Sequence, residues 1–206
     1  MSRLFRCALA SALAVASVTL AMRAPARVDA STVLQMRIED LAARCDLALM
    51  ARVTSSSASV DASGRIGTDY ALDVERTFAG VHAAHRTIRL PGGVLPDGRG
   101  MVIPGMPSLA VGERAIVFLS ATNPRGERLP IGLSQGRLRV VTANDGTQSI
   151  VSESADLELV DASGHALPNK GPSTLPYAAT IQRIETECAK RPTGQSARDA
   201  HHGERR

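Results

Sequence analysis

A run of five apolar residues, 115–119, is the feature that most constrains how this chain can fold. It is too short for a helix, and it lies between a charged residue and Ser120, which is typical of a strand covered on both faces. The preceding stretch, 104–112, is punctuated by glycine and proline and has no helical potential. We therefore predict that 115–119 is the central strand of a small β-barrel and that 104–112 is its entry loop.

Residues 1–30 have the three parts of a secretory signal, which are an arginine-containing start, an apolar run over 7–22 and a small-residue segment ending at Ala30. The apolar run is short for a membrane span, which needs about 20 residues. We expect cleavage after Ala30, with Ala21 as the alternative site and an uncleaved anchor as the alternative interpretation. The sequence thus predicts a protein exported to the periplasm or the medium, with no membrane span after cleavage.

The charge of the predicted mature chain gives no sign of a nucleic-acid partner. Residues 1–30 hold four of the 24 basic and one of the 20 acidic residues, which leaves 20 basic residues against 19 acidic ones. Both signs are mixed along the chain apart from a short basic tail, and few aromatic side chains remain to stack on bases or sugars. We therefore expect no binding to nucleic acid.

Two helices are predicted at the ends of a single domain, residues 31–191. Apolar side chains recur at i, i+4, i+7 and i+11 in each helix: Leu34, Ile38, Leu41 and Cys45 in the first, and Tyr177, Ile181, Ile184 and Cys188 in the second. We expect the first helix to open the mature chain at Ser31 and the second to begin near Ser173. The polar segment 192–206 is expected to be a disordered tail.

Between the helices, the pattern predicts antiparallel strands. Apolar and polar residues alternate in several segments, and glycine-containing turns separate them. Asp145-Gly146, between two such segments, is a strong indication of a hairpin. The predicted strands are 47–53, 69–77, 87–90, 115–119, 137–141, 148–151 and 157–160.

Cys45 and Cys188 are the cysteines that remain after cleavage, and each ends an apolar stripe. In an exported protein an even pair favours a disulfide. A Cys45–Cys188 bridge would join the first helix to the last and constrain the unfolded chain by about 5 kcal/mol in the simple loop-entropy model. The alternative is a pair of buried free thiols.

Residues 132–136 match the Gly-x-Ser-x-Gly nucleophile motif, with Ser134 at its centre. Asp156 and His165 follow in the order of an α/β-hydrolase triad. That motif requires a helix directly after the serine, whereas 137–141 has the pattern of a strand. The sequence therefore favours a turn before a strand, and Ser134, Asp156 and His165 are retained only as weak catalytic candidates.

The longest irregular stretch, 94–112, is the candidate binding segment. It is rich in glycine and proline and has no apolar period. Long irregular loops on rigid scaffolds often carry function. Its candidate contact residues are Pro104, Gly105, Met106, Pro107 and Ser108. The histidine and acidic residues show no metal-ligand spacing, so we expect neither a metal nor a cofactor.

Two segments carry a resemblance to known sequences. The pattern Gly-x-Pro-x-Leu-x-x-Gly-Glu-Arg-x-x-Val-Phe-Leu over 105–119, followed by Gln-Gly-Arg-Leu-Arg-Val over 135–140, resembles a group of uncharacterised secreted bacterial proteins. Leu109 and Leu138 stand where that pattern leads us to expect phenylalanine.

The order of segments also resembles netrin-type modules, which include the N-terminal domain of the tissue inhibitors of metalloproteinases. The similar features are Cys-Asp at 45–46, Val-Glu-Arg-x-Phe-x-Gly at 74–80, the Gly-Glu-Arg strand and a final helix. This resemblance implies an oligonucleotide/oligosaccharide-binding (OB) type barrel flanked by helices. Those inhibitors chelate the protease zinc through an N-terminal cysteine. No cysteine stands near Ser31, so that mechanism does not transfer.

Together these patterns predict a mainly β protein, a small antiparallel OB or netrin-like barrel with an N-terminal and a C-terminal helix. We expect an exported, non-catalytic module that recognises a protein or peptide partner, such as a secreted protease, through the 94–112 loop. One alternative is a small secreted serine hydrolase using Ser134. The other is a structural protein of the cell envelope.

Overall fold

The computed structural model of the chain describes residues 31–154, 156–168 and 171–191. The predicted signal, 1–30, and the predicted disordered tail, 192–206, lie outside the described residues. The elements in chain order are β1 (Ser31–Leu34), α2 (Ile38–Arg44), β2 (Leu47–Val60), β3 (Ile66–Ala79), β4 (His85–Pro91), β5 (Gly93–Val94), β6 (Gly100–Met101), β7 (Arg114–Leu119), the 3₁₀ helix η1 (Leu133–Gly136), β8 (Arg137–Thr142), β9 (Gln148–Ser152), β10 (Leu157–Val160), β11 (Ser173–Pro176) and α3 (Tyr177–Ala189).

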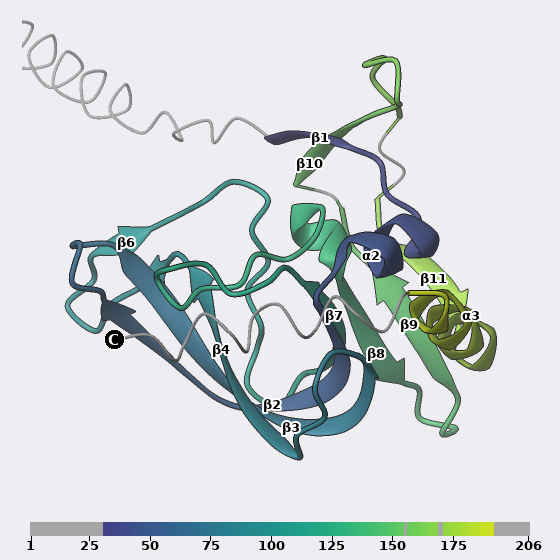
Figure 1. The fold of residues 1–206 in the computed structure, drawn as a ribbon, viewed down its shortest axis with the longest axis horizontal. Helices are drawn as coiled ribbons and strands as arrows, with labels where there is room; N and C mark the ends of the chain where they lie inside the picture. The colour runs from purple at the N-terminus through teal and green to yellow at the C-terminus, as the bar shows by residue number, and fades with distance from the viewer. Residues whose placement is uncertain (1–30, 155, 169–170, 192–206) are drawn as a thin grey trace, which may run out of the picture.

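The main sheet has seven antiparallel strands in the order β11-β9-β8-β7-β2-β3-β4 (Figure 1). The predicted central strand is confirmed, because β7 lies between β2 and β8 and its residues from Ala115 to Leu119 are all buried. β2 is buried over its first five residues as well. These two strands carry near-continuous apolar runs because both of their faces are covered.

Within the described residues, strand pairing does not close the expected barrel. β2 and β3 are 14 residues long, and register shifts along their ladder accompany a strong bend that carries β4 round (Figure 1). The edge strand β4 meets the 127–130 segment through a single bridge of Arg89 with Glu127, and the end of β7 meets it through Leu119 with Pro130. Residues 123–126 form a turn rather than a strand, so the mainly antiparallel sheet is curved and open.

The sheet separates two apolar cores. Ala48 and Met50 of β2 face one core, together with Ile116 and Phe118 of β7. The intervening residues of the same two strands face the other core, where they pack with buried side chains of β3 and β4. This division follows from the two-residue period of a strand. Helices α2 and α3 contribute side chains to the first core only.

The first predicted helix is partly wrong. Residues Ser31–Leu34 form β1, which pairs in parallel with β10, and the helix begins at Ile38. The stripe that began at Leu34 therefore loses its first member. β-branched residues at 32 and 33 favour a strand. Gln135 also holds the turn that follows, because its amide accepts the Met36 N–H at 2.8 Å and donates to the Leu34 carbonyl at 3.1 Å.

The second predicted helix is confirmed with a later start. α3 begins at Tyr177, because Ser173–Pro176 pairs with β9 as β11. Its predicted stripe packs inward, with Ile181, Ile184 and Cys188 buried. The Asp145-Gly146 hairpin joins β8 to β9 as predicted. The first predicted strand, by contrast, ends too early, since β2 continues through the polar run to Val60.

Candidate functional site

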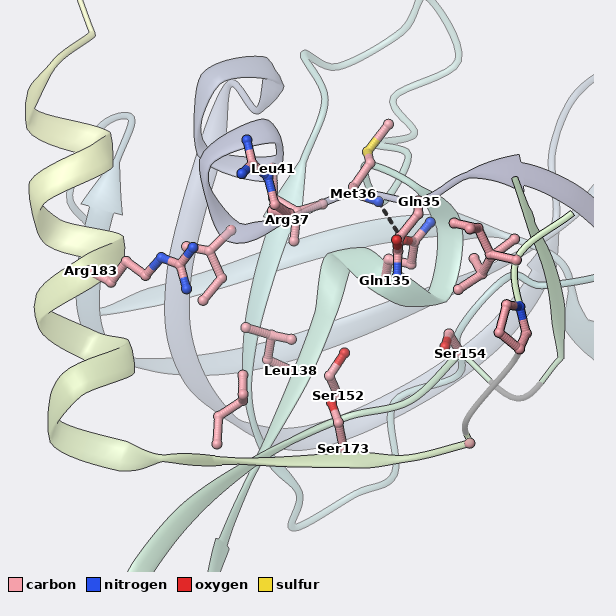
Figure 2. Close-up of a pocket in the computed structure, with 16 residues that line it drawn as sticks. Gln35, Met36, Arg37, Leu41, Gln135, Leu138, Ser152, Ser154, Ser173 and Arg183 are labelled. Atoms are coloured by element: carbon pink, nitrogen blue, oxygen red, sulfur yellow. Dashed lines mark hydrogen bonds between the residues drawn. The ribbon is translucent and has the colours of Figure 1, made fainter. Parts of the chain in front are cut away.

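A cavity of about 560 Å³ lies between the two helices and the end of the sheet (Figure 2). Its walls come from residues 35–37 and α2, from Gln135 of η1, from strands β8, β9, β10 and β11, and from α3. Leu41 and Leu138 line it on the apolar side, while Ser152 and Ser173 add hydroxyl groups (Figure 2).

The larger polar groups of this cavity are engaged within the protein. Gln135 binds the main chain at Leu34 and Met36. Arg183 Nε donates to Glu39 Oε1 at 2.6 Å, which joins α3 to α2. The pKa of Glu39 lies below its usual value, mainly because its carboxylate accepts a backbone hydrogen bond and also because Arg183 is adjacent. These side chains therefore hold the walls together, and we do not assign the cavity a ligand.

The catalytic candidates do not assemble into a triad. Ser134 and Asp156 line one hollow of about 520 Å³, beside Met106 and Pro107. His165 does not line it; its side chain is 81 % exposed and its Nδ1 lies 3.6 Å from Asp161 in the turn after β10. Among the described residues the Ser134 hydroxyl has no hydrogen-bond partner, so no base is in reach of it.

The backbone around Ser134 is also unlike that of a nucleophile turn. Gly132 and Leu133 have positive φ values of 69° and 58°, and the chain then enters the 3₁₀ helix η1 and strand β8. The prediction of a turn before a strand is confirmed. The Ser134 N–H donates to the Gly105 carbonyl at 2.9 Å, which fastens the 104–108 stretch to η1.

A buried ion-pair network lines the same hollow. Arg137 Nε lies 2.8 Å from Glu113 Oε1, and Arg137 Nη1 lies 2.9 Å from Glu153 Oε2. Glu113 also accepts the Ala110 N–H at 3.0 Å. Burial alone lowers the pKa of Arg137, but the hydrogen bonds and charges of the two glutamates outweigh it and raise that pKa. The network fixes the end of the 94–112 segment to β8.

The 94–112 segment is more ordered than its sequence suggests. β5 and β6 pair across a turn to form a two-stranded hairpin. Of the five predicted contact residues, Gly105 and Pro107 are buried, Pro104 and Met106 are half-buried, and Ser108 is exposed. The Pro104 carbonyl accepts the Ser31 hydroxyl at 2.9 Å. The structure therefore gives Pro104 and Gly105 anchoring contacts, while Met106, Pro107 and Ser108 form the wall between two hollows.

The second of these hollows, of about 280 Å³, is apolar and lies under the β5–β6 hairpin. Its floor includes Tyr70 and Leu90, which belong to the second core. Its rim includes Val94 and Val102, whose exposed fractions are 64 % and 75 %. Sequence reasoning missed these two valines, because periodicity cannot show which apolar residue of a loop stays exposed.

Cys45 and Cys188 are both buried free thiols in the described part of the chain, so the expected disulfide is not present in the structure. The alternative, two buried thiols, describes what is observed. The two thiols nevertheless influence each other, since Cys188 is the first cause of the lowered pKa of Cys45.

Comparison of the chain with protein-family models, with curated proteins and with solved structures finds no match. The arrangement described above is therefore interpreted from its own geometry. Across the described ranges, no helix has both the length and the apolar character needed to cross a membrane.

Proposed function

We propose that the protein is an exported, non-catalytic binding module that recognises a protein or peptide partner through the hollow under the β5–β6 hairpin. The observation that carries this proposal is the exposure of Val94 and Val102 on the rim of an apolar hollow. Solvent-exposed apolar side chains grouped around a depression are typical of interaction sites.

The geometry of the hairpin puts the two valines together. Val94 pairs with Gly100, and Val102 comes directly after β6 ends at Met101. Both valines line the same hollow. Because Gly100 has no side chain, the valines are not separated by a bulky group, and a partner can contact both at once.

The size of the hollow favours a side chain of a larger partner over a free small molecule. Its volume of about 280 Å³ is at the low end for small-molecule sites, which usually hold roughly 300–1,000 Å³. A leucine, methionine or phenylalanine side chain would fill such a space. Apolar anchors inserted into pockets of this kind dominate many protein interfaces.

The hairpin that carries the valines is firmly attached to the sheet. The Thr68 hydroxyl donates to the Gly92 carbonyl at 2.7 Å. At Gly93, where φ is +136°, a Cβ atom would lie 2.2 Å from the Thr68 hydroxyl, so only glycine fits. Leu95 is buried beneath the same turn. A fixed hairpin lowers the entropic cost of binding.

Two finer expectations belong to this proposal. Export rests on the signal-like composition of residues 1–30. A netrin-like or OB-type origin of the sheet is supported by its curvature and by the 127–130 segment, which bridges the edge strand β4 at Glu127 and the end of β7 at Pro130. The separation of Ser134 from His165 leaves the hydrolase alternative without support from the geometry.

The test is a paired capture experiment. The predicted mature chain is immobilised beside a Val94→Asp/Val102→Asp variant and exposed to the exported proteins of its own host. We expect a defined protein to bind the wild type and to be lost from the variant. Titration of that purified protein should show Kd raised at least about tenfold, because two carboxylates would replace the apolar rim.

Val81→Asp is the matched control, because Val81 is 71 % exposed and lies in the turn after the other end of β3. It should bind like the wild type. A partner that binds all three proteins equally would contradict the proposed site. An absence of any captured protein would favour the structural-envelope alternative.

A further inference from the structure

The end of α3 brings the two buried cysteines together. Cys45 directly follows α2, and Cys188 is in the last turn of α3. The two helices lie side by side at one end of the sheet (Figure 1). Both cysteines belong to the helix-covered core, with exposed fractions of 1 % and 6 %. The Cys45 thiol donates to the Ala42 carbonyl at 3.4 Å, and both thiols are free.

Arg191 completes the group. Its Nη1 lies 3.5 Å from the Cys45 sulfur, and its backbone N–H donates to the Cys188 carbonyl at 3.3 Å. The hydrogen bond from Cys188 is the largest influence lowering the pKa of Cys45, and the Arg191 charge acts in the same direction. Burial and Asp46 oppose this shift. The pKa of Cys188 is raised, first by its hydrogen bond to Cys45, while Glu187 adds to the rise.

We propose that Cys45, Cys188 and Arg191 form a redox-active site in which Cys45 is the attacking thiolate and Cys188 the resolving thiol. This inference rests on the contacts among the three residues and is independent of the proposed binding function. A thiolate next to a guanidinium is the usual setting of a reactive cysteine. The oxidant it would take is a disulfide, carried either by a small thiol compound or by a protein.

The exchange has two steps. The Cys45 thiolate attacks one sulfur of the oxidant disulfide, which forms a mixed disulfide and expels a thiolate that takes up a proton. Cys188 then loses its proton and attacks the Cys45 sulfur, which releases the second half of the oxidant as a thiol. The protein dithiol has lost two electrons and two protons, and the oxidant has gained them.

The covalent bond would fix the two helices over the core. In the dithiol, the α2–α3 contact includes the surface pair of Glu39 with Arg183. Because Cys45 and Cys188 are only 1 % and 6 % exposed, the first step requires a local opening that exposes the Cys45 sulfur. Oxidation should therefore be slow in the native protein, and it should protect α3 from opening afterwards.

The first experiment uses the wild-type chain, so it does not depend on a variant that folds. The reduced protein is equilibrated in glutathione buffers of rising oxidised-to-reduced ratio. We expect the mass to fall by two hydrogens, both thiols to become resistant to maleimide after unfolding, and a 45–188 linked peptide. Tm should rise by about 10 °C, from a typical disulfide contribution in a domain of this size. Thiols that stay free, or that end as glutathione adducts, would overturn the proposal.

The second experiment tests the part played by Arg191. Oxidation at pH 7 should be at least about threefold slower in Arg191→Gln, with its pH profile shifted upward, because a smaller fraction of Cys45 is thiolate. Arg191→Lys should restore much of the rate. Lys190→Gln removes a charge that pairs with Glu187 at the adjacent position and should leave the profile unchanged. Equal rates and profiles in all four proteins would overturn the role of Arg191.

Discussion

The two faces of the main sheet are closed in different ways. On one face, α2 and α3 pack on a continuous apolar core that contains Phe118. On the other, the apolar core made by β2, β3, β4 and β7 is covered by the 94–112 segment, and it ends at β8, where Arg137 and Arg139 replace apolar side chains. The helix-covered side has the 560 Å³ cavity, whose larger polar groups bind within the protein, whereas the irregular segment leaves an apolar hollow and a hollow lined by ion pairs.

This difference agrees with the proposed division of the protein into a stable scaffold and a recognition surface. Regular helices present a stripe that matches a sheet face, so side chains such as Phe118 and Ile184 are fully buried on that side. An irregular segment follows the surface less closely and leaves side chains such as Val94 exposed. We therefore assign the scaffold role to the helix-covered side and the binding role to the loop-covered side.

The largest expected effect is on the helix-covered side. Phe118 has an exposed fraction of 0 %, and Phe118→Ala would leave a cavity in the core. We expect a loss of about 3–5 kcal/mol in the free energy of unfolding, measured by urea denaturation. Phe78→Ala is the matched control, because Phe78 is only partly buried against the same core and should cost less. Equal losses would show that the burial of Phe118 does not decide the cost of its truncation.

An intermediate effect is expected on the loop-covered side. Arg137→Met would leave the Glu113 carboxylate, whose side chain is 6 % exposed, without its cation. We expect unfolding to require about 3 kcal/mol less, because an unpaired buried charge is costly. Adding Glu113→Gln to Arg137→Met should recover part of the lost stability. Arg99→Met is the control, because it removes only an exposed ion pair with Asp97 and should change stability little. A negligible effect of Arg137→Met would mean that water reaches the network.

The smallest expected effect concerns the surface pair between the helices. Arg183→Gln should cost at most about 0.5 kcal/mol at pH 7, since both partners are partly exposed. The pKa of Glu39 is lowered in the folded state. The stability that ionised Glu39 contributes is therefore fully present above the ordinary glutamate pKa of about 4.3. It is lost as the pH falls through the lower pKa that Glu39 has in the folded protein.

Urea titrations of wild type and Arg183→Gln at several pH values test this sign. The difference between the two proteins should shrink below about pH 4, as Glu39 becomes protonated. A difference that grows on acidification would show that Glu39 does not act through Arg183.

Local patterns were sufficient where one physical cause decides the structure. The apolar run 115–119 could only be a strand covered on both sides, and Asp145-Gly146 supplied the conformation that a tight hairpin needs. The α3 stripe likewise marked its buried side correctly. Reasoning from spacing also favoured a turn, rather than a nucleophile, around Ser134.

Sequence patterns failed where contacts with segments distant in the chain decide the local structure. Residues 54–59 are too polar to be recognised as a strand, yet β3 pairs with them and supplies the backbone hydrogen bonds. The 94–112 segment contains a hairpin because Thr68 and Leu95 fasten it to the sheet. The hollow rimmed by Val94 and Val102 exists only after these contacts form.

The sequence by itself determined the mainly β class, the central strand, the hairpin turns and the inward stripe of α3, because each depends on residues close together in the chain. Only the tertiary structure decided that β1 pairs with β10, that the sheet stays open, that the two cysteines are free, and that Arg191 lies against Cys45 while His165 stays away from Ser134. These outcomes depend on contacts between segments separated by many residues, and local spacing does not encode which of the possible partners meet.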